Sequence, residues 1–274
     1  MFARRPLTSP LAALAAFAAT GALTLLGPPG CDEGSDPPGA QRVTLATRAI
    51  SEGQGTGPFT TSTNWTVTLT HAQVSLGALY YFDGEPVLSR LGPTKAPGRR
   101  GWPFGVRNAF AHPGHYLPGN AVGQMLQAST FDLSAGDTAL PAGDGLTGAF
   151  RSAKVVFAAP ADGGAAISIE GRAEQGALAH AFTAAFTADE LRAEEGATES
   201  AVEGCAFETA EVRGDGTVTI VVHPAVWLDQ VDFSELPAAA AGAPATPLPA
   251  DSSARRALLR GLKKGLAYVF RYSP

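Results

Sequence analysis

The stretch that decides the fold class is residues 65–82, WTVTLTHAQVSLGALYYF. In its first part Trp65, Val67 and Leu69 alternate with threonines, and this period of two is typical of a strand with one buried face. The apolar phase shifts at His71, after which the alternation resumes. Such a shift indicates either a β-bulge inside one strand or the start of a second strand.

The rest of the chain repeats this pattern in short runs between turn residues. Glycine and proline account for 32 and 21 of the 274 residues, and charged residues for only 16%, a composition typical of turn-rich β proteins. The segment 254–262 is a predicted helix, with Asp251 or Ser252 as its cap. The remaining predicted strands are 43–50, 121–133, 146–159, 167–170, 178–186, 217–222 and 266–272. We predict an all-β fold, an antiparallel β-sandwich of the immunoglobulin-like or a related type, with a long irregular loop and one short C-terminal helix.

The first thirty residues have the three parts of a secretory signal. Arg4 and Arg5 give a positive start, the run 11–26 is rich in Leu and Ala, and a Gly-Pro-Pro-Gly break follows. The apolar run is shorter than the roughly 20 residues that a membrane span requires. We therefore predict that residues 1–30 are a signal peptide.

Cys31 follows the break directly, between Gly30 and Asp32. This arrangement looks like a bacterial lipoprotein cleavage site, in which the thiol of Cys31 carries the lipid and residues 31–42 tether the domain to a membrane. That reading places the protein in the cell envelope, on the periplasmic side or at the outer-membrane surface. The alternative is ordinary cleavage nearby, which would leave Cys31 free to form a disulfide with Cys205.

Charge and length limit the class of partner. Removing residues 1–30 takes away two arginines and no acidic residue, so the formal net charge moves from −5 to −7. An acidic chain lacks the basic footprint of a nucleic-acid-binding protein, and we expect no nucleic-acid partner. We assign residues 43–274 to a single β-sandwich domain with a Pro/Ala-rich insertion at 237–250.

Residues 91–120 differ from the rest of the chain because they are dense in Pro, Gly and Arg and show no helix or strand period. Loops of this length are usually functional or disordered, and interspersed aromatic residues argue against disorder. Trp102, Phe104 and Tyr116 are the predicted contact residues if this loop binds a glycan or another envelope protein.

The histidines carry most of the candidate chemistry. His112 and His115 form His-Pro-Gly-His inside the long loop, where the Pro-Gly turn can bring both imidazoles to one side. Imidazole suits copper and zinc, but a site needs three or four ligands. His71, at the phase shift, is the expected third ligand, and His223, at the end of TVTIVVH, is the fourth. The alternative is a set of ordinary surface histidines.

Sequence motifs give no support for an enzyme. GDGLTG at 143–148 matches the dinucleotide-binding pattern formally, but it does not open a helix, and we interpret it as a turn. The chain contains no GxSxG, HExxH or CxxC motif. We expect a protein that is not an enzyme.

Three segments resemble the MbnP-like periplasmic or surface proteins. They are AQVSLGALYYF at 72–82, the Leu-Pro-Ala-Gly turn feeding a strand in 140–157, and GTVTIVVHPAVWLDQVDF at 216–233. The resemblance implies a β-sandwich that binds copper and a partner that is a peroxidase-like haem protein. The chain departs from that family in its cysteines, because only Cys205 lies in the predicted domain.

These observations lead to two expectations for function. The first is an exported, lipid-anchored protein that binds a copper or zinc ion and acts in envelope metal handling. The second is a surface lipoprotein that binds a glycan or another envelope protein through the aromatic-rich loop 91–120.

Overall fold

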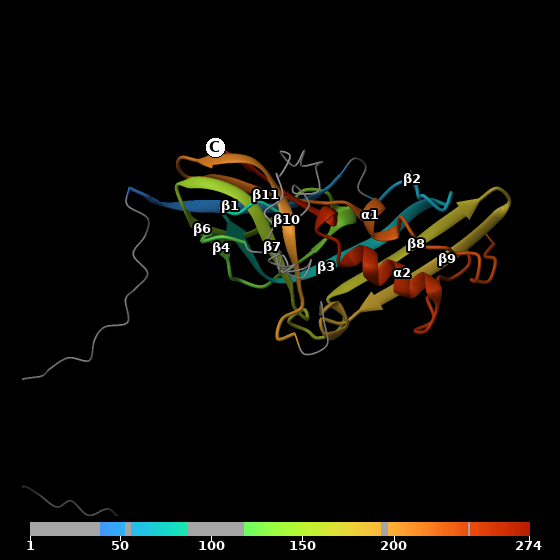
Figure 1. The fold of residues 1–274 in the computed structure, drawn as a ribbon. Helices are drawn as coiled ribbons and strands as arrows, with labels where there is room; N and C mark the ends of the chain where they lie inside the picture. Colours follow the sequence, from blue (N-terminus) through green and yellow to red (C-terminus); the bar gives the residue numbers. More distant parts are fainter. Residues whose placement is uncertain (1–38, 53–55, 87–117, 193–196, 241) are drawn as a thin grey trace, which may run out of the picture. The chain divides into compact units, whose positions relative to one another are not determined.

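Strand β3 (Thr66–Phe82) belongs to both parts of the fold, a closed ring of strands and a smaller extension of the sheet (Figure 1). The structure is a computed structural model that describes residues 39–52, 56–86, 118–192, 197–240 and 242–274. The first half of β3 pairs with β8 (Ile167–Gln175), and its second half pairs with β4 (Ala121–Met125) and β7 (Gly148–Phe157). The pairing with β8 shifts register between Leu69 and His71, so the phase shift in the sequence marks a bulge within one strand.

The strands that neighbour the second half of β3 form a closed ring. From β3 the order is β4, β6, β1, β11, β13, β10 and β7, and β7 pairs again with β3. The ring strands introduced here are β1 (Arg42–Ser51), β6 (Thr138–Leu146), β10 (Ala201–Val212), β11 (Gly216–Val222) and β13 (Tyr268–Ser273). The first half of β3 carries a smaller extension of β8, β9 (Leu178–Phe186) and β12 (Thr246–Pro247). Two further short strands, β2 (Phe59–Thr60) and β5 (Ser129–Asp132), also pair with β3.

Most neighbouring strands are antiparallel, as the sequence predicts. Three pairs are parallel, namely β1 with β11, β10 with β13, and β12 with β9, so the sheet is mixed. The predicted all-β, sandwich-like fold with one short C-terminal helix is confirmed. Among the described residues no helix is long and apolar enough to cross a membrane.

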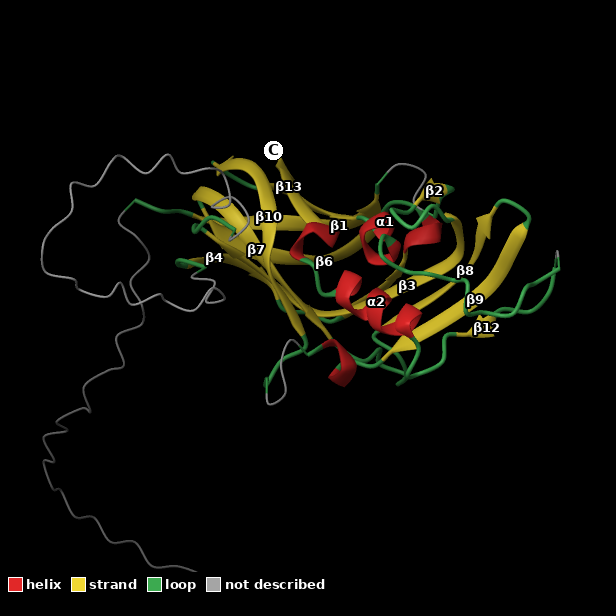
Figure 2. Cartoon of the chain, turned by 45° about the vertical axis from the view of Figure 1, so that its right-hand side comes forward, coloured by secondary structure: helices red, strands yellow, loops and turns green. Residues whose placement is uncertain are grey.

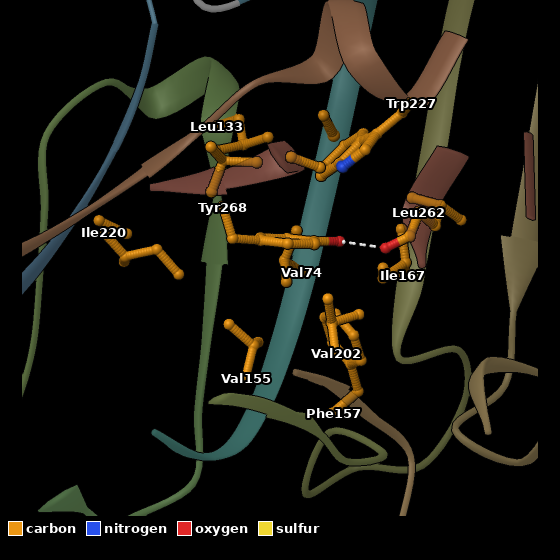
Figure 3. Close-up of a cluster of buried hydrophobic side chains, with 14 of the residues drawn as sticks. Val74, Leu133, Val155, Phe157, Ile167, Val202, Ile220, Trp227, Leu262 and Tyr268 are labelled. Carbon is orange, nitrogen blue, oxygen red and sulfur yellow. Dashed lines mark hydrogen bonds between the residues drawn. The ribbon is translucent and has the colours of Figure 1, made fainter. Parts of the chain in front are cut away.

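Large buried side chains fill the space between the strands. Four aromatic rings from four strands of the ring pack together at centroid separations of 5.4 to 5.9 Å: Tyr81, Phe150, Phe207 and Phe270. Close to them, Tyr268 packs beside Trp227 and donates from its hydroxyl to the carbonyl oxygen of Leu262 at 3.0 Å (Figure 3). Such interlocking cores fix strand positions, because close packing tolerates little rearrangement.

Two helices cover one face of this assembly (Figure 2). Helix α2 (Ser253–Leu262) begins at Ser252, whose side-chain oxygen accepts a hydrogen bond from the Arg255 amide at 3.1 Å. Its apolar side is buried, and Gly261 lies so close to α1 (Pro224–Leu228) that an added Cβ would stand 2.1 Å from the Trp227 carbonyl oxygen. The predicted helix and its cap are confirmed.

Candidate functional site

His71 is the centre of a polar cluster on the exposed side of β3. Its Nδ1 lies 3.1 Å from a carboxylate oxygen of Asp132, and its Nε2 lies 3.2 Å from the hydroxyl oxygen of Ser168. The side chain of His71 is 42% exposed and that of Asp132 is 33% exposed. The cluster is therefore held in place by neighbours and remains open to solvent.

The carboxylate of Asp132 decides which nitrogen of His71 carries a proton. Burial raises the pKa of Asp132, but hydrogen bonds from the Ser134 hydroxyl and amide, together with His71 and the Ala72 amide, lower it by more, so the net shift is downward. Asp132 is therefore ionised at neutral pH and can only accept hydrogen bonds. His71 therefore donates through Nδ1, and in the neutral imidazole Nε2 then holds the lone pair that faces Ser168.

The other two described histidines have different surroundings. His223 ends β11, its Nδ1 contacts the Glu52 carboxylate, and its side chain is 13% exposed. His180 is buried on β9, with its Nδ1 3.0 Å from the Pro237 carbonyl oxygen. The Nε2 atoms of both have no hydrogen-bond partner in the structure. In the part of the chain that the structure describes, no three His, Cys, Asp or Glu side chains gather into a group that could hold a metal ion.

The described residues on either side of segment 87–117 are clamped together at one end of the ring. The Asp83 carboxylate accepts hydrogen bonds from the Asn120 amide at 2.7 Å and from its side-chain nitrogen at 2.9 Å. The Gly84 amide donates to the Pro118 carbonyl oxygen at 2.9 Å. The described residues that border the segment therefore lie side by side, on backbone that β3 and β4 hold in place.

Several predicted site residues lie outside the described residues: His112, His115, Trp102, Phe104, Tyr116 and Cys31. The spacing of the chain nevertheless constrains the predicted ligand set. His115 stands three residues before Pro118, a reach of roughly 11 Å for an extended chain. His71 stands eleven residues before Phe82 along β3, a separation of roughly 36 Å.

His223 is similarly remote from the clamp, the name used here for the hydrogen-bonded contact of Asp83 and Gly84 with Pro118 and Asn120. Strand register aligns Phe82 with Ala121, Gly123 with Gly145 and Leu146 with Arg42, so β1 begins near the clamp. The opposite end of β1, Ser51, pairs with Val222 roughly 30 Å further along. The strand lengths therefore separate His71 and His223 from a site that contains His115.

Sequence reasoning missed Asp132 and Ser168. Both belong to outward-facing positions of strands, where Asp and Ser are common and carry no motif. Only the strand register brings them to His71. Both residues pair with Gln73, which lies two residues from His71 on β3.

Comparison with known proteins gives one distant likeness. No protein-family model matches the chain, and no curated protein sequence matches it. Among solved structures the chain is similar to MbnP from Methylosinus trichosporium, with 10% sequence identity and a TM-score of 0.40. The alignment covers 86% of this chain and 99% of that one.

Proposed function

We propose that this protein is an exported, lipid-anchored binding module of the cell envelope that binds through the segment between Pro86 and Pro118. The clamp at the ends of the segment carries this proposal. Rigid scaffolds that present long loops are a common architecture of binding proteins, since the scaffold positions the loop and the loop supplies the contacts. Asp83, Gly84 and Asn120 supply that fixed base here.

The ligand that we propose is a copper or zinc ion held by His112 and His115. The pair belongs to the presented segment, and neutral imidazole is a good ligand for both metals. Strand lengths separate His71 and His223 from Pro118, which supports a site whose remaining ligands come from the segment itself, from its base or from water. This binding function requires no catalytic group.

Metal titration of the signal-free chain, residues 32–274, tests the proposal. We expect one Cu²⁺ or Zn²⁺ per chain by calorimetry and by metal analysis after dialysis. In the double variant His112→Ala/His115→Ala, affinity should fall by about 100-fold or more, since two ligands are lost. The matched control is His71→Ala, which should bind within about twofold of the wild type, a difference below roughly 0.5 kcal/mol.

Two results would contradict the metal site. One is the absence of stoichiometric metal in the wild type, and the other is a loss of binding in His71→Ala as large as in the double variant. Absence of metal would leave a second candidate, a glycan or envelope protein bound through Trp102, Phe104 and Tyr116. The segment 87–117 contains five basic residues and no acidic one, which favours an anionic partner: Arg90, Lys95, Arg99, Arg100 and Arg107.

A further inference from the structure

Ser168, His71 and Asp132 form a continuous chain of hydrogen bonds on neighbouring strands. The Ser168 hydroxyl oxygen lies 3.2 Å from His71 Nε2, and His71 Nδ1 lies 3.1 Å from the Asp132 carboxylate. The order is hydroxyl, imidazole, carboxylate, with a different ring nitrogen facing each partner. This is the order that nucleophilic serine hydrolases use, on many unrelated folds.

The direction of each hydrogen bond follows from Asp132. Its other carboxylate oxygen already accepts bonds from the Ser134 amide at 2.8 Å and the Ser134 hydroxyl at 2.6 Å. These bonds orient the carboxylate, which accepts the Nδ1 proton of His71. His71 Nε2 therefore accepts from the Ser168 hydroxyl and is placed to remove its proton.

The three side chains stand on neighbouring strands, and none of the three residues is fully buried. Strands β5, β3 and β8 are consecutive hydrogen-bonded neighbours at this point, with Gln73 of β3 opposite both Asp132 and Ser168. The side chains of His71 and Asp132 are 42% and 33% exposed, so a molecule from solvent can approach the imidazole. Sites built on strands hold their geometry more closely than sites built on loops.

We propose that Ser168 is an activated nucleophile that accepts acyl groups from esters, with His71 as its general base. The Ser168 oxygen attacks the ester carbonyl carbon while its proton moves to His71 Nε2. His71 then protonates the departing alkoxide, and an acyl ester of Ser168 remains. A water molecule attacks that ester, its proton passes through His71 to Ser168, and the carboxylic acid leaves.

Two neighbours define the class of substrate. Gln73 lies on the same face as His71, two residues along β3, and its side-chain amide is suited to donate to the oxyanion that forms on the carbonyl oxygen. Glu170 lies directly opposite His71 on β8 and is exposed, so it disfavours anionic substrates. Uncharged acyl esters fit the site best. This activity is separate from metal binding by the segment 87–117, and it differs from the expectation that the protein is not an enzyme.

Covalent labelling of the signal-free chain with a fluorophosphonate tests the proposal, because this reagent reports activated serines. We expect one adduct per chain by intact-mass spectrometry, with peptide mapping placing it on Ser168. The variant Ser168→Ala should lose the adduct, and His71→Gln should lower the labelling rate by about 100-fold or more. Ser129→Ala, on the neighbouring strand β5, is the matched control and should label like the wild type.

Hydrolysis of p-nitrophenyl acetate gives a second measurement. In Ser168→Ala, any product that is still released comes from catalysis by the exposed imidazole of His71 alone. We expect release to fall in that variant by about tenfold or more. Absence of an adduct, an adduct mapped to another residue, or labelling unchanged in His71→Gln would each overturn the proposal. The position of the adduct in the wild type decides the matter even if a variant folds poorly.

Discussion

At the scale of single residues, the neighbours of each described histidine decide what it can do. His71 has a carboxylate on one nitrogen and a hydroxyl on the other, with its ring open to solvent. His180 lies edge-on to Trp65 at a ring separation of 5.2 Å and is buried. Of these two histidines only His71 combines access to solvent with a carboxylate at one ring nitrogen and a hydroxyl at the other, and this is why the proposed chemistry is assigned to His71.

Cys205 shows the same dependence on surroundings. It is fully buried on β10, it is a free thiol, and burial raises the pKa of that thiol well above its usual range. Because the thiolate is the species that attacks a disulfide reagent, we predict no reaction of Cys205 with such a reagent in the folded chain 32–274. Absorbance should report one equivalent of thiol after addition of guanidinium chloride. Rapid reaction in native buffer would show that β10 opens locally.

At the scale of elements, the contact between α1 and α2 is set by one glycine. Alanine has the higher helix propensity, by about 1 kcal/mol. At Gly261, however, its Cβ would stand 2.1 Å from the Trp227 carbonyl oxygen, which belongs to backbone and cannot turn away. The overlap outweighs the propensity, and the helices must separate or shift.

We therefore predict that Gly261→Ala lowers the free energy of unfolding by about 2–3 kcal/mol, measured by urea denaturation. Gly214→Ala is the matched control, because a Cβ at Gly214 meets nothing within 4 Å. That variant should stay within about 0.5 kcal/mol of the wild type. Equal stability of the two variants would mean that α2 adjusts without loss.

The strands also show what the sequence could predict and what it could not. Clean alternation identified β3, and the start and end of β9 are those predicted, 178–186. Strand β10 was not predicted, because Gly204 adopts a positive φ of 69° and the register with β7 shifts between Val202 and Cys205. A bulge of this kind breaks the period of two on which strand prediction depends. Predicted strand 121–133 is two strands, because residues 126–128 separate the end of β4 from the start of β5.

The candidate site was less predictable than the strands. His71 could be selected from the sequence because it stands at the phase shift, but Asp132 and Ser168 are 61 and 97 positions away. They meet only because β5 and β8 border β3 in one particular register. Register depends on long-range packing rather than on local pattern, so it could not be predicted from this single sequence.

At the scale of the whole molecule, the clamp joins the described residues on both sides of segment 87–117. We predict that replacing residues 87–117 by a four-residue Gly/Ser linker leaves the domain folded, with a Tm equal to or above that of the full chain. A shorter loop costs less entropy to close, by roughly 1–2 kcal/mol. The same variant should lose metal binding.

Calorimetric melting and circular dichroism check this prediction. Asp83→Ala in the shortened chain is the companion variant, and it should lower the Tm because the two hydrogen bonds that Asn120 donates to the Asp83 carboxylate are lost. Unfolding of the shortened chain with Asp83 intact would contradict the view that the clamp alone closes this end.

The closed ring of strands also has a consequence for the order in which the molecule is assembled. Strand β13 lies between β11 and β10, so it joins the two arcs of the ring. Until residues 268–273 have been synthesised, β11 lacks one neighbour and the ring remains open. Folding dominated by such distant pairings is slow. Closure of the ring therefore depends on pairings between strands far apart in the sequence, and we expect it to be a late step of folding.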